Sequence, residues 1–399
     1  MSEGYRPGEP GYRRVAVALF LAGLATFALV HAPQPLLPEL AADFVLSPGQ
    51  AMLSVSATMV GLGLALLIAG PGTEVLGRTP LIFASLFTSA VVALACSLAP
   101  SWPVLIVLRA VQGVALAGLP AVATAYLREE VHPSATSRAV GLYIGGTAIG
   151  GMSGRLIAGI LGDALGWRFA FAALGTLALG CAITAWWLLP PSRRFVPASP
   201  QPREVLGGAF RALREPGLVC LYCVSGTLMG GFVAVFNALG FRLTAEPYGL
   251  PLAVSSLVFV TYAVGSVSAG GAGALADRHG YARVLLWAMV LALAGLGLTA
   301  AAPLPLVIVG VVVFTAGFFA AHGVASGWVA IRASQTGNGP GQAASFYLFS
   351  YYLGAGVLGG LAGPAWSAGA WPGVLALVGG LWVLTLGLAV LLGRLTRAA

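Results

Sequence analysis

Long apolar stretches follow one another along the whole chain, separated by short polar breaks. A helix needs about 20 mainly apolar residues to cross a bilayer, and twelve such stretches can be placed. They cover residues 14–37, 51–70, 79–98, 103–126, 138–161, 168–189, 217–240, 252–273, 281–300, 305–330, 341–363 and 371–393. The first stretch is too long for a signal peptide and lacks a small-residue cleavage pattern, so we interpret it as a span. The pattern predicts an all-α membrane protein with twelve transmembrane helices.

Composition narrows the class further. Of the 399 residues, 58% are hydrophobic and only 8% are charged, whereas ordinary soluble domains have about 25% charged residues. This excludes a soluble globular protein and a disordered one. All four cysteines, Cys96, Cys181, Cys220 and Cys223, lie in apolar stretches, so they predict neither a disulfide framework nor a metal site. We expect no cofactor.

The positions of the arginines predict the orientation, because positively charged loops stay on the cytoplasmic side. All 20 basic residues are arginines, and 16 of them fall on one side if the N-terminus is cytoplasmic. The other four, Arg109, Arg155, Arg168 and Arg242, lie within spans or at their outer ends. We therefore expect a multi-pass protein of the cytoplasmic (inner) membrane with both termini in the cytoplasm.

The longest polar segment, residues 190–216, divides the chain into two halves. The predicted parts are a cytoplasmic tail (1–13), an N-terminal six-helix bundle (14–189), a basic linker (190–216), a C-terminal six-helix bundle (217–393) and a second tail (394–399). Within the linker, residues 203–214 place arginines beside apolar residues, as an interfacial helix does. A solvated linker is the alternative, and nucleic-acid binding is not expected.

The two halves repeat each other, which is the clearest sign of organisation in the sequence. At an offset of 203, Gly70, Glu74 and Gly77 align with Gly273, Asp277 and Gly280; at 204, Gly113, Tyr143, Gly150 and Trp167 align with Gly317, Tyr347, Gly354 and Trp371. Two six-span halves joined by a basic loop are typical of secondary transporters, whose substrate site lies near mid-membrane between the halves.

Several segments also resemble the major facilitator superfamily. GPGTEVLGR (70–78) and GALADRHG (273–280) are similar to its signature in loops 2–3 and 8–9, and RAVQG (109–113) is similar to its fourth-helix motif. The stretches 145–161, 236–243 and 317–328, the last running on to 344–354, resemble the YnfM-type (acriflavine-sensitivity) exporter group. The resemblance implies the major facilitator fold, two pseudo-symmetric six-helix bundles, and an exporter-like function.

The loop signature predicts a cytoplasmic gate. A carboxylate at a helix end pairs with arginine and with the positive N-terminus of a neighbouring helix. The residues assigned to this gate are Gly70, Glu74, Gly77, Arg78, Asp277, Arg278 and Arg283. Glu74 stands where the family usually has aspartate, which predicts a weaker latch in the N-terminal half. An ordinary charged turn is the alternative.

Two arginines lie inside predicted spans. Arg109 and Arg155 are each about six residues from the outer end, or roughly 9 Å deep at the rise of an α-helix. An ionisable group at that depth is a functional candidate, although a long side chain can also extend to the interface. We assign both to a substrate cavity together with Gln34, Asn237, Tyr347 and Tyr351.

Proton coupling requires a group that can gain and lose a proton. The sequence offers His31, His322, Glu39 and Asp43 as candidates, and histidine titrates in the appropriate range. The alternative for each histidine is a hydrogen-bonded packing residue. The predicted spans place no carboxylate at mid-membrane, so the cavity is expected to be net positive.

Glycines in the span 138–161 recur at 141, 145 and 150 and again, every four residues, at 146, 150 and 154. Such a ladder lets two helices approach closely. The fifth helix of exporters in the family is also glycine-rich, so the ladder fits both close packing and an exporter.

The sequence thus predicts a monomeric transporter, not an enzyme, that moves a small organic molecule by alternating access, with proton-coupled efflux as the main hypothesis. The chain has no nucleotide-binding motif. Uptake or exchange of a small anionic metabolite is a second hypothesis, which the two arginines favour. A non-transporting membrane receptor or scaffold is a third.

Overall fold

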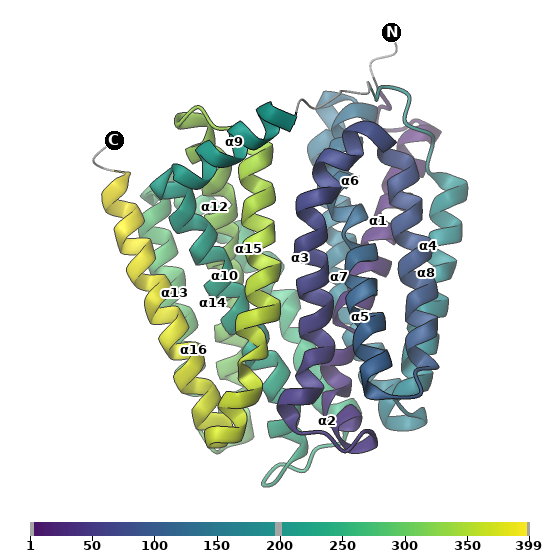
Figure 1. The fold of residues 1–399 in the computed structure, drawn as a ribbon. Helices are drawn as coiled ribbons and strands as arrows, with labels where there is room; N and C mark the ends of the chain where they lie inside the picture. Colours follow the sequence, from purple (N-terminus) through teal and green to yellow (C-terminus); the bar gives the residue numbers. More distant parts are fainter. Residues whose placement is uncertain (1–3, 196–201, 397–399) are drawn as a thin grey trace. The chain divides into compact units, whose positions relative to one another are not determined.

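The computed structural model describes residues 4–195 and 202–396, except for the side chains of 70–76, 202–206 and 266 (Figure 1). The elements are α1 (Pro10–His31), α2 (Pro33–Asp43), α3 (Pro48–Leu76), α4 (Arg78–Ser97), α5 (Trp102–Leu116), α6 (Gly118–Glu130), α7 (Pro133–Leu165), α8 (Trp167–Leu188), α9 (Pro202–Arg214), α10 (Pro216–Thr244), α11 (Leu252–Ser256), the 3-10 helix η1 (Leu257–Thr261), α12 (Tyr262–His279), α13 (Tyr281–Leu298), α14 (Leu304–Gln335), α15 (Pro340–Gly360) and α16 (Ala362–Leu395). The predicted all-α class is confirmed.

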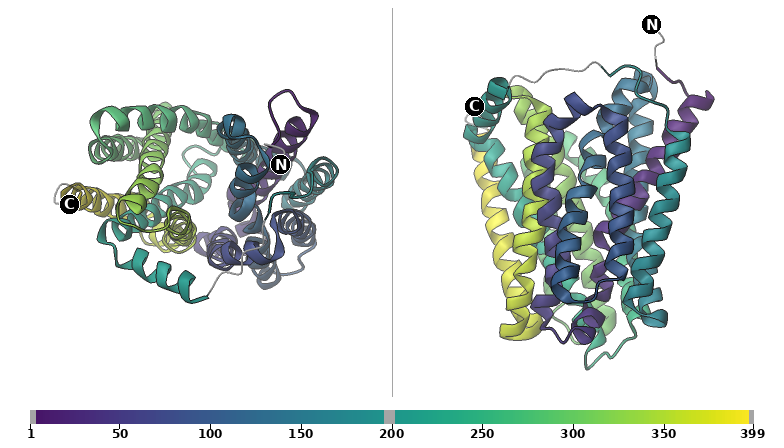
Figure 2. Two further views of the ribbon diagram at one scale, coloured as in Figure 1. Left: turned by 90° about the horizontal axis from the view of Figure 1, so that it is seen from above. Right: turned by 45° about the vertical axis from the view of Figure 1, so that its right-hand side comes forward.

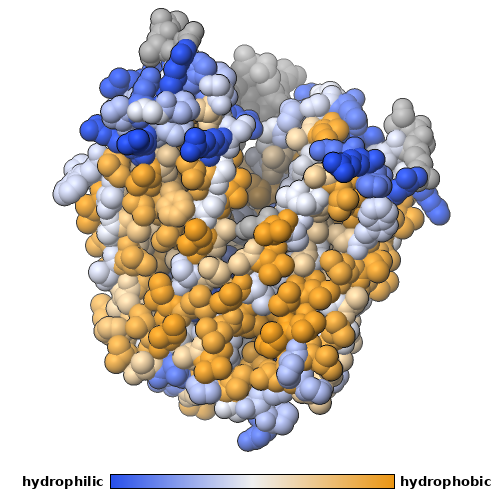
Figure 3. All heavy atoms as spheres, turned by 180° about the vertical axis from the view of Figure 1, so that it is seen from behind, coloured by the Kyte–Doolittle hydropathy of each residue, from blue (hydrophilic) through white to orange (hydrophobic). Residues whose placement is uncertain are grey.

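Eleven helical stretches of the described chain are long and apolar enough to cross a membrane. Three of the predicted spans are each built from more than one element: α1 with α2, α5 with α6, and α11 through α12. The one predicted span without such a stretch, 341–363, corresponds to α15, whose serines and tyrosines lower its hydropathy. Figure 3 shows apolar side chains over much of the visible face, with hydrophilic ones gathered at its upper end.

The chain divides into two compact units. Unit 1 comprises Met1–Glu39, Ala57–Pro200 and Leu252–Ser256, and unit 2 comprises Leu40–Ser56, Gln201–Pro251 and Leu257–Ala399. In unit 2, α9 contacts α10 and α15. Seen from above, α9 lies lengthwise while the long helices of that unit are seen nearly end-on (Figure 2).

The predicted glycine ladder is a packing surface between α1 and α7 of unit 1. A Cβ atom added at Gly146 would lie 2.3 Å from the Phe20 carbonyl oxygen, and one at Gly150 would lie 2.2 Å from the Leu24 carbonyl oxygen. Gly141 and Gly145 have nothing within 4 Å of such an atom. Only the 146–150–154 set therefore brings the two backbones together.

Unit 2 repeats this contact at the aligned glycine. A Cβ atom at Gly354 of α15 would lie 2.1 Å from the Gly226 carbonyl oxygen of α10. The pairs α1–α7 and α10–α15 are thus the same close helix contact built twice. The two halves thus share the close packing of one helix pair as well as the spacing of the aligned glycines.

At a second aligned pair of positions, the two units have different residues in a similar backbone conformation. Gly166 precedes α8 with φ of 87°, and the residue aligned with it at the offset of 204, Ala370, has φ of 48° and ψ of −137° at a kink inside α16. This backbone region suits glycine, whereas a Cβ atom strains it by about 1–3 kcal/mol. Unit 2 therefore holds alanine in a conformation that unit 1 gives to glycine.

We expect Ala370→Gly to stabilise the protein, because it removes the Cβ atom from this conformation. The gain should be about 1 kcal/mol, since the greater freedom of glycine in the unfolded chain offsets part of the relief. Thermal unfolding in detergent measures it, with Ala368→Gly, two residues earlier in the same helix, as the control that should destabilise. A lower melting temperature for Ala370→Gly would contradict the assignment of strain.

Candidate functional site

In unit 1, the predicted site residues gather around a break between α1 and α2. α1 ends at His31 and α2 begins at Pro33. Proline has no backbone N–H, so Pro33 cannot donate the helical hydrogen bond to the Leu29 carbonyl. A buried carbonyl without a donor is costly, and the sequence around the break therefore requires a donor from another helix.

Arg109 of α5 supplies that donor. Its Nη1 donates to the Leu29 carbonyl oxygen (3.2 Å) and its Nη2 donates to the Val30 carbonyl oxygen (3.0 Å). Nη1 also bonds Oε1 of Gln112, and the guanidinium lies 5.8 Å from the centre of the Phe171 ring. The side chain is completely buried. These contacts give Arg109 a structural role in fastening the end of α1.

The rest of the RAVQG segment fixes α5 to its neighbours. Gln112 donates through Nε2 to the Ser89 carbonyl of α4 (3.1 Å). The Thr58 hydroxyl of α3 donates to the Arg109 carbonyl (3.0 Å), and a Cβ atom at Gly113 would lie 2.1 Å from the Thr58 carbonyl oxygen. The segment thus joins α5 to α1, α3 and α4.

Arg155 of α7 approaches the same break from the α2 side. Its Nε donates to Oε1 of Gln34 (2.6 Å), and its Nη1 donates to the Gly151 carbonyl one turn earlier in α7 (2.6 Å). Arg155 and Gln34 are each 1% exposed, and His31 is 6% exposed with Nδ1 3.3 Å from the Phe27 carbonyl oxygen. The structure therefore brings together His31, Gln34 and the two arginines.

The two carboxylates of the first predicted span lie elsewhere in α2. Glu39 accepts a hydrogen bond through Oε1 from the backbone N–H of Trp167, the first residue of α8 (2.7 Å). This is the favourable position for an anion at a helix N-terminus. Asp43 is the last residue of α2 and is exposed.

In unit 2, the predicted residues of α14 and α15 form one cluster. The hydroxyl of Tyr347 lies 3.0 Å from Nδ1 of His322, and the rings of His322 and Tyr351 have centroids 4.8 Å apart. Tyr347 is buried, whereas His322 and Tyr351 are half-buried. Asn237 of α10 is completely buried, so its amide lies inside the helix packing of the unit.

The predicted gate residues have different surroundings in the two units. Gly77 precedes α4 with φ of 83°, and Arg78 is buried and forms an ion pair with Glu129 of α6 (Nη2 to Oε1, 2.9 Å). Gly70 and Glu74 lie in α3, and the side chains of residues 70–76, with that of Glu74, lie outside the described part of the chain. The acidic partner of Arg78 that the structure describes is thus Glu129, which the sequence did not single out.

The gate residues of unit 2 are on the surface. Asp277 accepts a hydrogen bond from the Tyr281 hydroxyl (3.1 Å), and Arg278 and Arg283 are exposed. Within the part of unit 2 that the structure describes, no ion pair joins Asp277 to either arginine. In this conformation the signature of unit 2 is a charged surface turn.

Sequence reasoning missed a buried carboxylate at the end of α6. Glu130 is 3% exposed, and its Oε1 accepts hydrogen bonds from the backbone N–H groups of Arg193 (2.6 Å) and Arg194 (2.9 Å). The Tyr126 hydroxyl, one turn earlier, donates to the Pro190 carbonyl (2.7 Å). Together they hold the segment that follows α8. The tyrosine and glutamate spaced four apart were the only signal.

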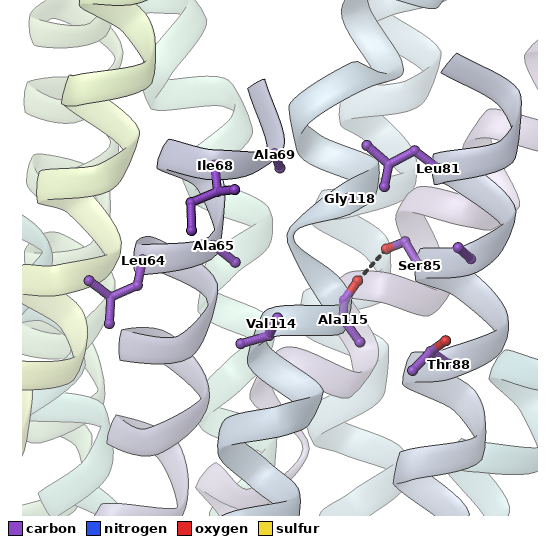
Figure 4. Close-up of a pocket in the computed structure, with 11 residues that line it drawn as sticks. Leu64, Ala65, Ile68, Ala69, Leu81, Ser85, Thr88, Val114, Ala115 and Gly118 are labelled. Atoms are coloured by element: carbon purple, nitrogen blue, oxygen red, sulfur yellow. Dashed lines mark hydrogen bonds between the residues drawn. The ribbon is translucent and has the colours of Figure 1, made fainter. Parts of the chain in front are cut away.

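A further opening lies in unit 1 between α3, α4, α5 and α6 (Figure 4). Its volume is about 430 Å³. Leu64 and Ile68 line it from α3, and Ser85 of α4 donates its hydroxyl to the Ala115 carbonyl at its edge (2.6 Å). The lining is mainly apolar.

Within the described residues, no group of three or more histidine, cysteine or acidic side chains could hold a metal ion.

Comparison with known proteins identifies the family. Residues 15–272 match the Major Facilitator Superfamily. The chain is 40% identical to the inner membrane transport protein YnfM of Escherichia coli, over 98% of this chain and 92% of that one. It is 38% identical to the MFS-type transporter YybF of Bacillus subtilis, over 98% and 96%. A bacterial homologue of the lysosomal transporter Spinster, solved facing inward, shares the fold with a TM-score of 0.77 at 15% identity, over 98% of both chains.

These matches confirm the resemblance seen in the sequence and favour a transporter over a receptor or an enzyme. The duplicated helix contacts, the loop signatures and the full-length relatives agree: the chain belongs to the Major Facilitator Superfamily and is a secondary transporter by fold.

Proposed function

We propose that this transporter exports a small organic molecule across the cytoplasmic membrane in exchange for protons. Alternating access would expose its polar side chains to the two compartments in turn. The domain bounds predicted from the sequence, a monomeric state and a cytoplasmic location of both termini are parts of the same proposal. Reporter domains fused to each end, one active only in the cytoplasm and one only outside it, test the orientation.

The observation that carries proton coupling is the position of His322. It is a titratable group inside a membrane-spanning helix, half-buried, and held by Tyr347 through Nδ1. The other ring nitrogen, Nε2, has no hydrogen-bond partner among the described residues. In the tautomer whose Nδ1–H donates to the Tyr347 oxygen, the imidazole can gain and lose a proton at Nε2 while Nδ1 keeps the ring in place. His31 is more deeply enclosed, Glu39 binds the start of α8, and Asp43 lies at a helix end.

The test is proton movement that depends on substrate. Proteoliposomes that contain a pH-sensitive dye are given an outward substrate gradient, and acidification or alkalinisation is followed. His322→Gln should abolish the proton signal while substrate still exchanges across the membrane. His31→Gln, Glu39→Gln and Asp43→Asn are the matched controls and should retain most of the signal. Flux without any proton movement in the parent protein would refute the exchange mechanism.

A second function, uptake or exchange of a small anionic metabolite, is favoured by the paired cations of unit 1. Arg155 and Arg109 lie close to one helix break, and Gln34 contacts Arg155 directly. Comparing the flux of organic anions with that of cationic dyes separates the two functions. Arg155→Gln should reduce anion flux at least tenfold if this function is correct, and unchanged anion flux would exclude it.

A further inference from the structure

Aromatic rings in unit 2 fall into a buried set and a half-buried set. The buried rings stack on one another: Phe232 lies 3.8 Å from Phe318 between centroids, and Phe314 lies 4.6 Å from Trp382. All four side chains are at most 1% exposed. They form the rigid interior against which the second set packs.

The half-buried rings are Tyr262 of α12, Phe319 and His322 of α14, and Tyr351 of α15, and we call them the aromatic face. Tyr262 meets Phe319 edge-on at 5.7 Å, and His322 lies 4.8 Å from Tyr351. Phe318 connects the two pairs, because its ring contacts both Phe319 (5.1 Å) and His322 (6.0 Å). Three helices thus contribute two pairs of half-buried rings that are joined through the buried ring of Phe318.

The chemistry of this face distinguishes it from a surface that contacts lipid. A phenol and an imidazole are costly to expose to acyl chains, and polar groups at membrane depth face a cavity or other protein. Large aliphatic side chains, such as Val309 and Ile331 of α14, supply the exposed apolar surface of the same helix. The half-buried phenol and imidazole rings of the aromatic face therefore do not belong to the lipid-contacting surface of α14.

We propose that the aromatic face binds a planar aromatic ring of the transported molecule, with Nε2 of His322 as the polar contact at its edge. This names the substrate class and rests on the proposed transport function. Offset and edge-to-face contacts between rings are favourable beyond the area they bury. The buried stack fixes the positions of the rings in advance, so little freedom is lost when a ligand ring packs against them.

Binding without any gradient tests the proposal. The full-length protein in lipid nanodiscs is dialysed against three pairs of labelled probes that differ in a planar aromatic group: gallate and quinate, inosine and ribose, ethidium and tetrabutylammonium. The three pairs cover anionic, neutral and cationic ligands. In at least one pair we expect the aromatic probe to bind ten or more times more tightly than its partner. Equal binding in all pairs, or no binding of any planar probe, overturns the proposal.

Variants locate the contact. Tyr351→Leu and Phe319→Leu should each weaken the planar probe about threefold to tenfold, as expected for the loss of one ring contact. Tyr351→Phe keeps the ring, so its affinity for the planar probe should stay within twofold of that of the parent protein. Phe169→Leu removes an exposed ring of α8 and should leave the affinity for the planar probe unchanged. Equal effects of Tyr351→Leu and Phe169→Leu would show that the aromatic face is not the site.

The outcomes separate this proposal from proton exchange. Aromatic-selective binding together with flux that moves no protons would keep the substrate class and reject the coupling. If a saturated probe competes fully with the planar probes and its flux is coupled to protons, the coupling is kept and the aromatic substrate class is rejected.

Discussion

Gly150→Leu is expected to prevent the chain from folding into a stable monodisperse protein. A Cβ atom at this position would lie 2.2 Å from the Leu24 carbonyl oxygen and 2.6 Å from its Cα atom. Both atoms belong to the backbone of α1, so no side chain can move aside, and α1 and α7 must separate. Overpacking of this kind costs about 3 kcal/mol or more. The measurement is the yield and melting temperature of a fluorescent fusion in detergent.

Gly145→Leu is the matched control. It lies in the same helix, five residues earlier, and nothing lies within 4 Å of a Cβ atom there. It should fold as the parent does, and helix propensity should make it slightly more stable. Gly354→Leu should reproduce the defect of Gly150→Leu in unit 2, where the Gly226 backbone is 2.1 Å away. Equal yields for Gly150→Leu and Gly145→Leu would show that the two helices can separate at little cost.

Arg109→Leu is expected to lower the melting temperature strongly without changing the charge of the surface. The substitution removes the donors to the carbonyls of Leu29 and Val30 and the partner of Gln112. Each buried acceptor left without a donor costs about 1–3 kcal/mol. The sum makes this one of the most damaging single substitutions in unit 1.

Two further variants check this explanation. Arg109→Lys should recover part of the stability, because an ammonium group can donate to one or both carbonyls. Arg283→Leu removes an exposed arginine of α13 and should shift the melting temperature by no more than about 1–2 °C, as surface changes usually do. An Arg109→Leu protein as stable as Arg283→Leu would mean that water or another group satisfies the carbonyls.

Hydropathy predicted the spans well because a bilayer imposes length and apolarity on any helix that crosses it. It could not predict the breaks within them. Pro33 interrupts the first predicted span, and the span from 252 begins with a short helix and a 3-10 turn. These interruptions depend on single backbone hydrogen bonds, which an average over twenty residues does not record.

The candidate site was predictable as a set of residues but not as a set of contacts. Depth within the spans singled out Arg109 and Arg155, yet their acceptors include backbone carbonyls of α1 and the side-chain amide of Gln34, which belong to other helices. The spacing of glycines allowed two ladders, and the position of α1 decides between them. Glu130 could be placed at a helix end, but its burial against residues 193 and 194 depends on tertiary packing.

The break between α1 and α2 makes the residue required at position 109 depend on the residue at position 33. Pro33 withholds an amide from the Leu29 carbonyl and Arg109 supplies the donor in its place, so the loss of Arg109 leaves a defect as long as Pro33 is present. In relatives without Pro33 we expect the ordinary helical bond to the carbonyl at position 29 to form and position 109 to vary more freely. Relatives that keep Pro33 should retain a long side chain with a hydrogen-bond donor at position 109, whichever molecule they transport.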